Sequence, residues 1–168
     1  MIPTLETERL RLRPWRDDDL DAFSVFTADR KATEFVGGTF SRGDTWRRIA
    51  MFLGHWQLRG FGNWVIEEKA SGAFVGYSGL WKPDGWPEPE IMWGLLPTHH
   101  GHGYATEAAA RARAYAFEVL RWPTAVSYIV AANLPSRRVA ERLGAKHDGT
   151  TELKGTAVDV WRHPSPQT

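Results

Sequence analysis

No cysteine occurs among the 168 residues of the chain, although nine tryptophans and six histidines do. This absence excludes disulfide bonds, cysteine-ligated zinc, iron–sulfur clusters and a cysteine nucleophile, so any thiol must arrive with a ligand. The chain also lacks an excess of one charge, since its formal net charge is +1. It has no apolar run near the roughly 18 residues that a membrane span needs. We therefore expect neither a dedicated nucleic-acid surface nor a membrane segment.

The length and composition are those of an ordinary globular protein. A chain of 168 residues with 42% hydrophobic and 24% charged residues predicts one domain, residues 1–168, with a core of normal size. Residues 1–6 show neither the basic start nor the apolar run of a signal peptide, which favours a cytoplasmic location.

Hydrophobic periodicity predicts alternating strands and helices. Strict alternation over residues 9–13 indicates a strand, and apolar residues at helical spacing indicate helices after the acidic residues 17–19 and after a capping Ser41. Further strands are expected at 64–68, 74–81, 90–96, 126–131 and 157–161, the first two of these forming an antiparallel hairpin. Further helices are expected at 105–120 and 135–143, and residues 164–168 are expected to fray.

The strand at 90–96, the glycine turn at 99–104 and the helix from residue 105 form the most informative unit. Such a turn leaves backbone N–H groups unpaired at the positive end of the helix dipole, where phosphate binds. Gly101 and Gly103 permit close approach of a ligand, and Thr106 adds a hydroxyl donor. The turn differs from the dinucleotide fingerprint, whose third glycine would fall at Thr106, and it lacks the Gly-Lys-Ser/Thr of nucleotide-triphosphate loops.

Three histidines, His99, His100 and His102, lie in the same turn. A metal site is disfavoured because no suitably spaced fourth ligand accompanies them, so no metal is expected. Either a partly protonated histidine supports bound phosphate, or these are exposed turn residues.

Three segments together resemble the GNAT superfamily of N-acyltransferases. Residues 95–108 resemble its acyl-CoA-binding motif, Gln/Arg-x-x-Gly-x-Gly/Ala, with His100, Gly103 and Ala105 at the patterned positions and His100 departing from the usual Gln or Arg. Residues 133–145 resemble the Asn-x-x-Ser-x-x-Val/Ala-x-x-x-Leu-Gly-Phe/Ala element. Residues 5–14 resemble the opening strand of the branch that contains ribosomal-protein N-terminal acetyltransferases. The resemblance implies an α+β fold with a mixed, mostly antiparallel sheet, helices on both faces, and a splayed parallel strand pair that holds acyl-CoA.

The resemblance also implies a binding site for acetyl-CoA as co-substrate. The amides of residues 101–106 would hold the pyrophosphate, residues 93–96 would offer backbone hydrogen bonds to the pantetheine arm, and the Leu95 N–H would polarise the thioester carbonyl. The strand at 126–131 is the expected splayed neighbour. The cofactor-binding residues implied are Trp93, Leu95, Leu96, His100, Gly101, His102, Gly103, Tyr104, Ala105, Thr106, Asn133 and Ser136.

The same resemblance implies catalytic roles. Glu90, at the start of the cofactor strand, is the expected base, with Glu88 as the second choice. Ser136 is either the acid that returns a proton to the coenzyme A thiolate or a helix cap, and both roles are compatible. Asn133 either bonds the pantetheine amides or ends a strand.

Among the tryptophans, Trp81 and Trp86 flank a proline-rich loop and are candidates for the wall of an acceptor channel. Trp46 and Trp56 are expected to be packing residues of the second helix.

The predicted function is transfer of an acetyl group from acetyl-CoA to a primary amine, either a peptide N-terminus or a small-molecule amine. Because the chain has no cysteine for an acyl-enzyme, direct transfer in a ternary complex is expected. The alternative is a coenzyme A-binding sensor or interaction module without turnover, against which Glu90 and Ser136 count. A homodimer is expected only by analogy.

Overall fold

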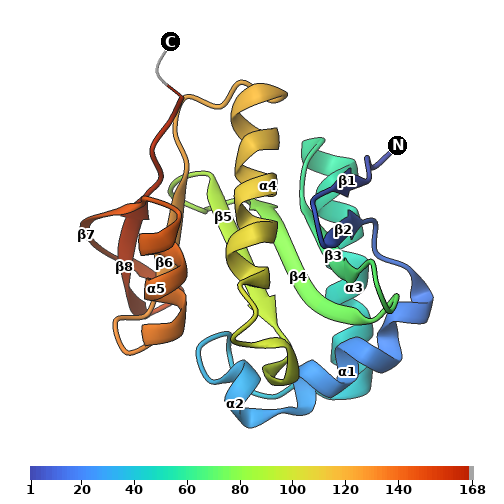
Figure 1. Cartoon of the computed structure of the whole chain (residues 1–168). Helices are drawn as coiled ribbons and strands as arrows, with labels where there is room; N and C mark the ends of the chain where they lie inside the picture. Colours follow the sequence, from blue (N-terminus) through green and yellow to red (C-terminus); the bar gives the residue numbers. More distant parts are fainter. Residues whose placement is uncertain (167–168) are drawn as a thin grey trace.

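A computed structural model describes residues 1–166 and places their strands in one mixed sheet with helices on both faces (Figure 1). The strands are β1 (Leu5–Glu6), β2 (Leu10–Arg13), β3 (Asn63–Glu68), β4 (Phe74–Trp81), β5 (Glu90–Leu95), β6 (Val126–Ile129), β7 (Lys146–Leu153) and β8 (Thr156–Arg162). Their order in the sheet is β1-β2-β3-β4-β5-β6-β8-β7. Every neighbouring pair is antiparallel except β5 and β6, as predicted for the fold class.

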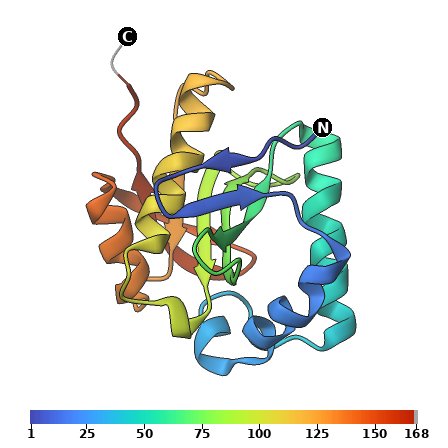
Figure 2. The ribbon, with the colours of Figure 1, turned by 45° about the vertical axis from the view of Figure 1, so that its right-hand side comes forward.

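Five α-helices and two 3-10 turns connect the strands. They are η1 (Asp17–Asp19), α1 (Leu20–Ala28), α2 (Arg30–Thr33), α3 (Arg42–Arg59), η2 (Pro97–His99), α4 (Tyr104–Glu118) and α5 (Leu134–Arg142). Figure 2 shows the sheet between α4 on one side and α3 on the other. Within the described part of the chain, no helix is long and apolar enough to cross a membrane.

Each sheet face carries its own hydrophobic cluster. Three alanines of α4, Ala108, Ala109 and Ala112, are fully buried, because their small side chains let the helix lie close to the sheet. The opposite face holds an aromatic cluster beneath α1 and α3, in which the rings of Trp15 and Phe23 lie 4.7 Å apart. The two clusters fix α4 and the central strands relative to each other.

The parallel pair β5 and β6 diverges almost at once. β5 is paired with β4 along its whole length, from Glu90 to Leu95. On its other edge, β5 forms a single residue pair with β6 within the described residues, between Glu90 and Val126. Beyond this pair the backbone of β5 faces a widening gap, so the predicted splay is present.

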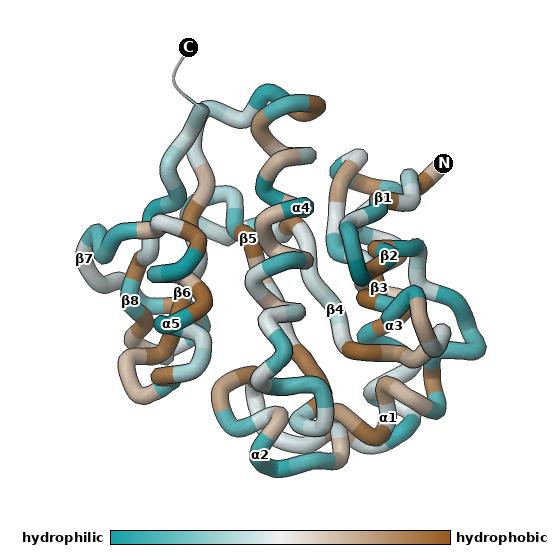
Figure 3. Tube along the Cα trace, viewed as in Figure 1, coloured by the Kyte–Doolittle hydropathy of each residue, from teal (hydrophilic) through white to brown (hydrophobic). Residues whose placement is uncertain are grey.

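Hydrophobic periodicity did not predict two of the strands, β1 and β7, or the helix α2. β1 and α2 are too short for a periodic signal. β7 is a largely exposed edge strand whose hydrophilic sequence has no alternating apolar residues (Figure 3). The predicted tail at 164–168 includes residues 167–168, which lie outside the described residues.

Candidate active site

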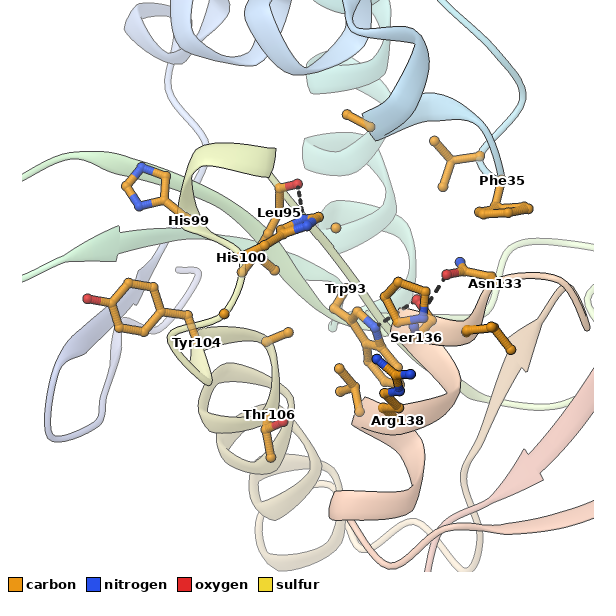
Figure 4. A pocket seen from close by; sticks show the side chains of 18 of the residues that line it. Phe35, Trp93, Leu95, His99, His100, Tyr104, Thr106, Asn133, Ser136 and Arg138 are labelled. Carbon is orange, nitrogen blue, oxygen red and sulfur yellow. Dashed lines mark hydrogen bonds between the residues drawn. The ribbon is translucent and has the colours of Figure 1, made fainter.

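A cavity of about 950 Å³ lies where the end of β5 meets the first turns of α4 and α5 and the segment around α2 (Figure 4). Of the residues predicted to bind the cofactor, all but Leu96 and His102 line it. These lining residues are Trp93, Leu95, His100, Gly101, Gly103, Tyr104, Ala105, Thr106, Asn133 and Ser136. Residues from two separate stretches of the sequence, 93–106 and 133–136, therefore share one cavity.

The first turn of α4 presents unpartnered donors to this cavity. Gly103 caps the helix with φ 78°, and because glycine has no side chain, no side-chain cap covers the first N–H groups. The buried hydroxyl of Thr106 has no hydrogen-bond partner among residues 1–166. A Cβ at Gly101 would meet open space. Donors without hydrogen-bond partners at a helix N-terminus suit an anionic group such as a phosphate.

Residues near the N-terminus of the chain hold this turn in place. The Glu107 carboxylate accepts hydrogen bonds from Thr7 Oγ1 at 2.6 Å, Arg9 N at 2.9 Å and Arg9 Nε at 2.7 Å. The Arg9 guanidinium also lies over the Tyr104 ring, 4.7 Å from its centroid. The segment that resembles the opening strand of the family thus anchors the turn at the start of α4.

The three histidines of the turn point in different directions. His100 Nε2 lies 3.1 Å from the Leu95 carbonyl oxygen, whereas the rings of His99 and His102 lie against Tyr104. Among the residues that the structure describes, no group of three or more His, Asp or Glu side chains is placed to hold a metal ion.

The splayed edge of β5 offers two backbone donors. Leu96 N donates to Val75 O of β4 at 2.9 Å, so alternation turns the N–H groups of Leu95 and Trp93 to the opposite edge, toward the gap. Leu96 was predicted to bind the cofactor but does not line the cavity, because its N–H is used by β4 and its side chain packs against the aromatic cluster.

Asn133, and not Ser136, caps α5. Its Oδ1 accepts from Ser136 N at 3.3 Å. The Ser136 hydroxyl is free of that role and instead accepts a hydrogen bond from Trp93 Nε1 at 3.3 Å, between two residues that line the cavity (Figure 4). This contact joins β5 to α5 across the gap.

Glu90 lies at the closed end of the splay and is not among the residues that line the cavity. Its side chain is 8% exposed, and its Oε2 accepts from Trp86 Nε1 at 2.8 Å. Burial raises the pKa of Glu90 to about 7, while hydrogen bonds from Trp86 and from the Tyr128 backbone act in the opposite direction. A carboxyl group with such a pKa exchanges a proton near neutral pH, as a general base must.

Glu88, the second choice for the base, is occupied by an ion pair. Its two oxygens accept from the Arg162 guanidinium at 3.0 and 3.1 Å. This bidentate contact favours Glu90 over Glu88 as a proton acceptor.

The tryptophans predicted near an acceptor channel have different environments. Trp81 is buried and stacks on His55 with ring centroids 4.3 Å apart, whereas Trp86 contacts Glu90. On the second helix, Trp56 is buried as predicted, but Trp46 is 49% exposed and donates to Asp17.

Sequence reasoning missed other cavity residues. Arg138 and Arg142 of α5 line it, as do Lys31 and Phe35 near α2. The four-residue spacing of the arginines places them on one helix face, and this spacing could have indicated a positively charged surface of α5. No sequence pattern pointed to the α2 segment.

A family model for the GNAT acetyltransferase domain matches residues 9–146, and the chain belongs to this family. The crystal structure of an acetyltransferase from Agrobacterium tumefaciens is 37% identical, with a TM-score of 0.89, covering 98% of this chain and 96% of that one. The family resemblance and the fold class deduced from the sequence are thereby confirmed.

Two solved structures share the fold at lower identity. One, from Vibrio cholerae and described as a ribosomal-protein-serine acetyltransferase, is 19% identical with a TM-score of 0.79, covering 96% of this chain and 97% of that one. The other, a Vibrio cholerae spermidine N-acetyltransferase in complex with CoA and spermine, is 19% identical with a TM-score of 0.73, covering 93% and 94%.

Proposed function

We propose that this protein transfers an acetyl group from acetyl-CoA to a primary amine by direct transfer in a ternary complex. The observation that carries the proposal is the uncapped first turn of α4, with its unpartnered Thr106 hydroxyl, in a cavity that reaches the splayed edge of β5. Membership of the GNAT family supports acetyl transfer to an amine in general.

The cavity residues fit the parts of acetyl-CoA. The turn of residues 101–106 suits the pyrophosphate, Arg138 and Arg142 add positive charge, and the gap-facing N–H groups of Trp93 and Leu95 suit the pantetheine arm and the thioester carbonyl. When bound, acetyl-CoA supplies the acetyl group as an activated thioester. The Leu95 N–H then acts as a fixed donor for the carbonyl oxygen as negative charge develops on it.

Glu90 is proposed as the base that accepts the proton of the amine, directly or through water. Its pKa of about 7 leaves a useful fraction ionised near neutral pH. A lysine-type amine, with a pKa near 10.4, needs such help more than an α-amine, with a pKa of about 7.7–8.0. Ser136, whose hydroxyl reaches the cavity, is proposed to return a proton to the leaving thiolate.

Direct transfer is favoured because the chain offers no activated nucleophile in the cavity. There is no cysteine. The Ser136 oxygen contacts the Trp93 indole rather than a histidine or carboxylate, within the described residues. Initial-rate plots with both substrates varied should therefore intersect, and parallel lines would count against direct transfer.

The acceptor is proposed as either a peptide N-terminus or a small-molecule amine. The two Vibrio cholerae proteins carry names with different acceptors on the same fold, so the fold alone does not select one. The nearby charges do not select one either, since Lys31 and Glu34 both line the cavity.

Release of free thiol from acetyl-CoA tests the proposal, because a chain without cysteine gives no background of its own. Peptides with free N-termini, polyamines and aromatic monoamines would be compared with acetyl-CoA alone. Amine-dependent release that falls strongly in Glu90→Gln is expected. Binding of acetyl-CoA without release on any amine would instead identify a coenzyme A-binding module.

A further inference from the structure

A side-chain hydrogen bond takes the place of the first backbone hydrogen bond that is missing between β5 and β6. Val126 N donates to Pro89 O at 3.0 Å, so an uninterrupted parallel ladder would next join Tyr128 N to Ile91 O. Instead, the Ser127 hydroxyl donates to Ile91 O at 2.6 Å. The splay therefore begins at a serine contact.

Two further side chains, the buried His163 and the partly buried Arg113, extend this contact across the molecule. His163 Nε2 lies 2.8 Å from Ser127 Oγ, and Arg113 of α4 lies 3.4 Å from His163 Nδ1. Arg113 can only donate, so Nδ1 accepts and Nε2–H donates to Ser127, whose single proton goes to Ile91 O. These hydrogen bonds connect α4, through the residue after β8 and through Ser127 of β6, to Ile91 of β5. The two middle residues are almost fully buried, with Ser127 2% and His163 3% exposed.

The Ser127–His163 pair has the composition of a nucleophile and its base, but it is not built as one. The serine proton points to a backbone carbonyl rather than to the histidine. Burial and the neighbouring Arg113 lower the pKa of His163 to about 3, so the ring stays neutral and does not take up a proton. Neither residue lines the cavity. The pair is a fixed set of hydrogen bonds.

We infer that Ser127, His163 and Arg113 are positioning residues that set the width of the splay between β5 and β6. Ile91 lies two residues from Trp93 and four from Leu95 on the same edge of β5. Movement at the Ile91 carbonyl therefore changes the direction of both gap-facing N–H groups. This inference rests on the proposed acetyl-CoA site and adds what holds that site open.

Calorimetric titration with acetyl-CoA tests the inference without any knowledge of the acceptor. Ser127→Ala and His163→Phe, which leave buried partners unpaired, should each raise the Kd by about tenfold. His163→Gln keeps an N–H donor toward Ser127 and should stay within about threefold of wild type. Should Ser127→Ala fail to fold, the two His163 variants carry the same comparison.

Thr45→Val is the matched control. It removes another buried hydroxyl contact, the 2.6 Å bond between Thr27 and Thr45, at a site outside the cavity. Its thermal unfolding midpoint should fall while its Kd stays unchanged. An unchanged Kd in Ser127→Ala and His163→Phe, or an equal rise in Thr45→Val, would overturn the inference. If wild type does not bind acetyl-CoA, the proposed function fails first.

Discussion

Glu90 shows at the residue scale how a protein interior adapts a common side chain to proton transfer. Burial removes water from the carboxylate and raises its pKa, while the Trp86 indole N–H stabilises the charged form and limits the rise. The resulting pKa of about 7 depends on both influences.

Substitution of either residue should change the pH dependence of kcat/KM. In wild type, kcat/KM should fall as pH drops through about 7, because protonated Glu90 accepts no proton. Trp86→Phe removes the stabilising hydrogen bond and should move this limb to higher pH. Glu90→Gln should remove the contribution of Glu90 to this limb, leaving the titration of the amine itself, and should lower kcat/KM by about 10²-fold or more. The control Glu88→Gln breaks the pair with Arg162 and should leave the limb in place; an unmoved limb in Trp86→Phe would contradict the assignment.

The same residue should lower stability at alkaline pH. The pKa of Glu90 rises from 4.5 to about 7 on folding, so the native state binds the proton more tightly than the unfolded chain. This contribution is complete below the unfolded pKa and is lost as pH rises through 7. At about 1.4 kcal/mol per pH unit, Glu90→Gln should raise the free energy of unfolding by up to about 3 kcal/mol near pH 8.

Urea unfolding of wild type and Glu90→Gln at several pH values would measure this difference. The two proteins should converge in stability as pH approaches the unfolded pKa of 4.5. A difference that is constant with pH would show that Glu90 is not held in a neutral state by burial.

At the scale of elements, the unit formed by β5, its turn and α4 was predictable, because glycines and a proline mark its boundaries. Its anchoring was not, since Glu107 meets Thr7 and Arg9 about a hundred positions away in the sequence. From the sequence, Ser136 was a possible cap of α5, but the structure shows that Asn133 is the cap. β7 escaped prediction because an exposed edge strand needs no apolar residues.

The first turn of α4 gives the prediction that belongs to this scale. Thr106→Val keeps the shape of the side chain but removes the unpartnered hydroxyl, so the Kd for acetyl-CoA should rise by about three- to tenfold. Thr98→Val is the control, because Thr98 is exposed in η2 and does not line the cavity. Equal Kd values for Thr106→Val and wild type would remove the hydroxyl from the phosphate site.

At the scale of the whole molecule, the sequence was sufficient for the fold class, and most of the residues that it predicted to bind the cofactor line the cavity. The three motifs that resemble the family implied a mostly antiparallel sheet with a splayed parallel pair, which composition alone did not. The missing part is long-range: Ser127 and His163 lie 36 positions apart, and no periodicity shows that they meet. The same limit hid Lys31 and Phe35, whose segment reaches the cavity only through folding.

The central claim is that this chain moves an acetyl group from acetyl-CoA to the nitrogen of an amine. Mass spectrometry of the acceptor after incubation with isotopically labelled acetyl-CoA measures this most directly. The label should appear on the amine of an acceptor, with wild type faster than Glu90→Gln and with no label on the protein. Thiol release with no labelled amine, or label held on the protein, would contradict the account.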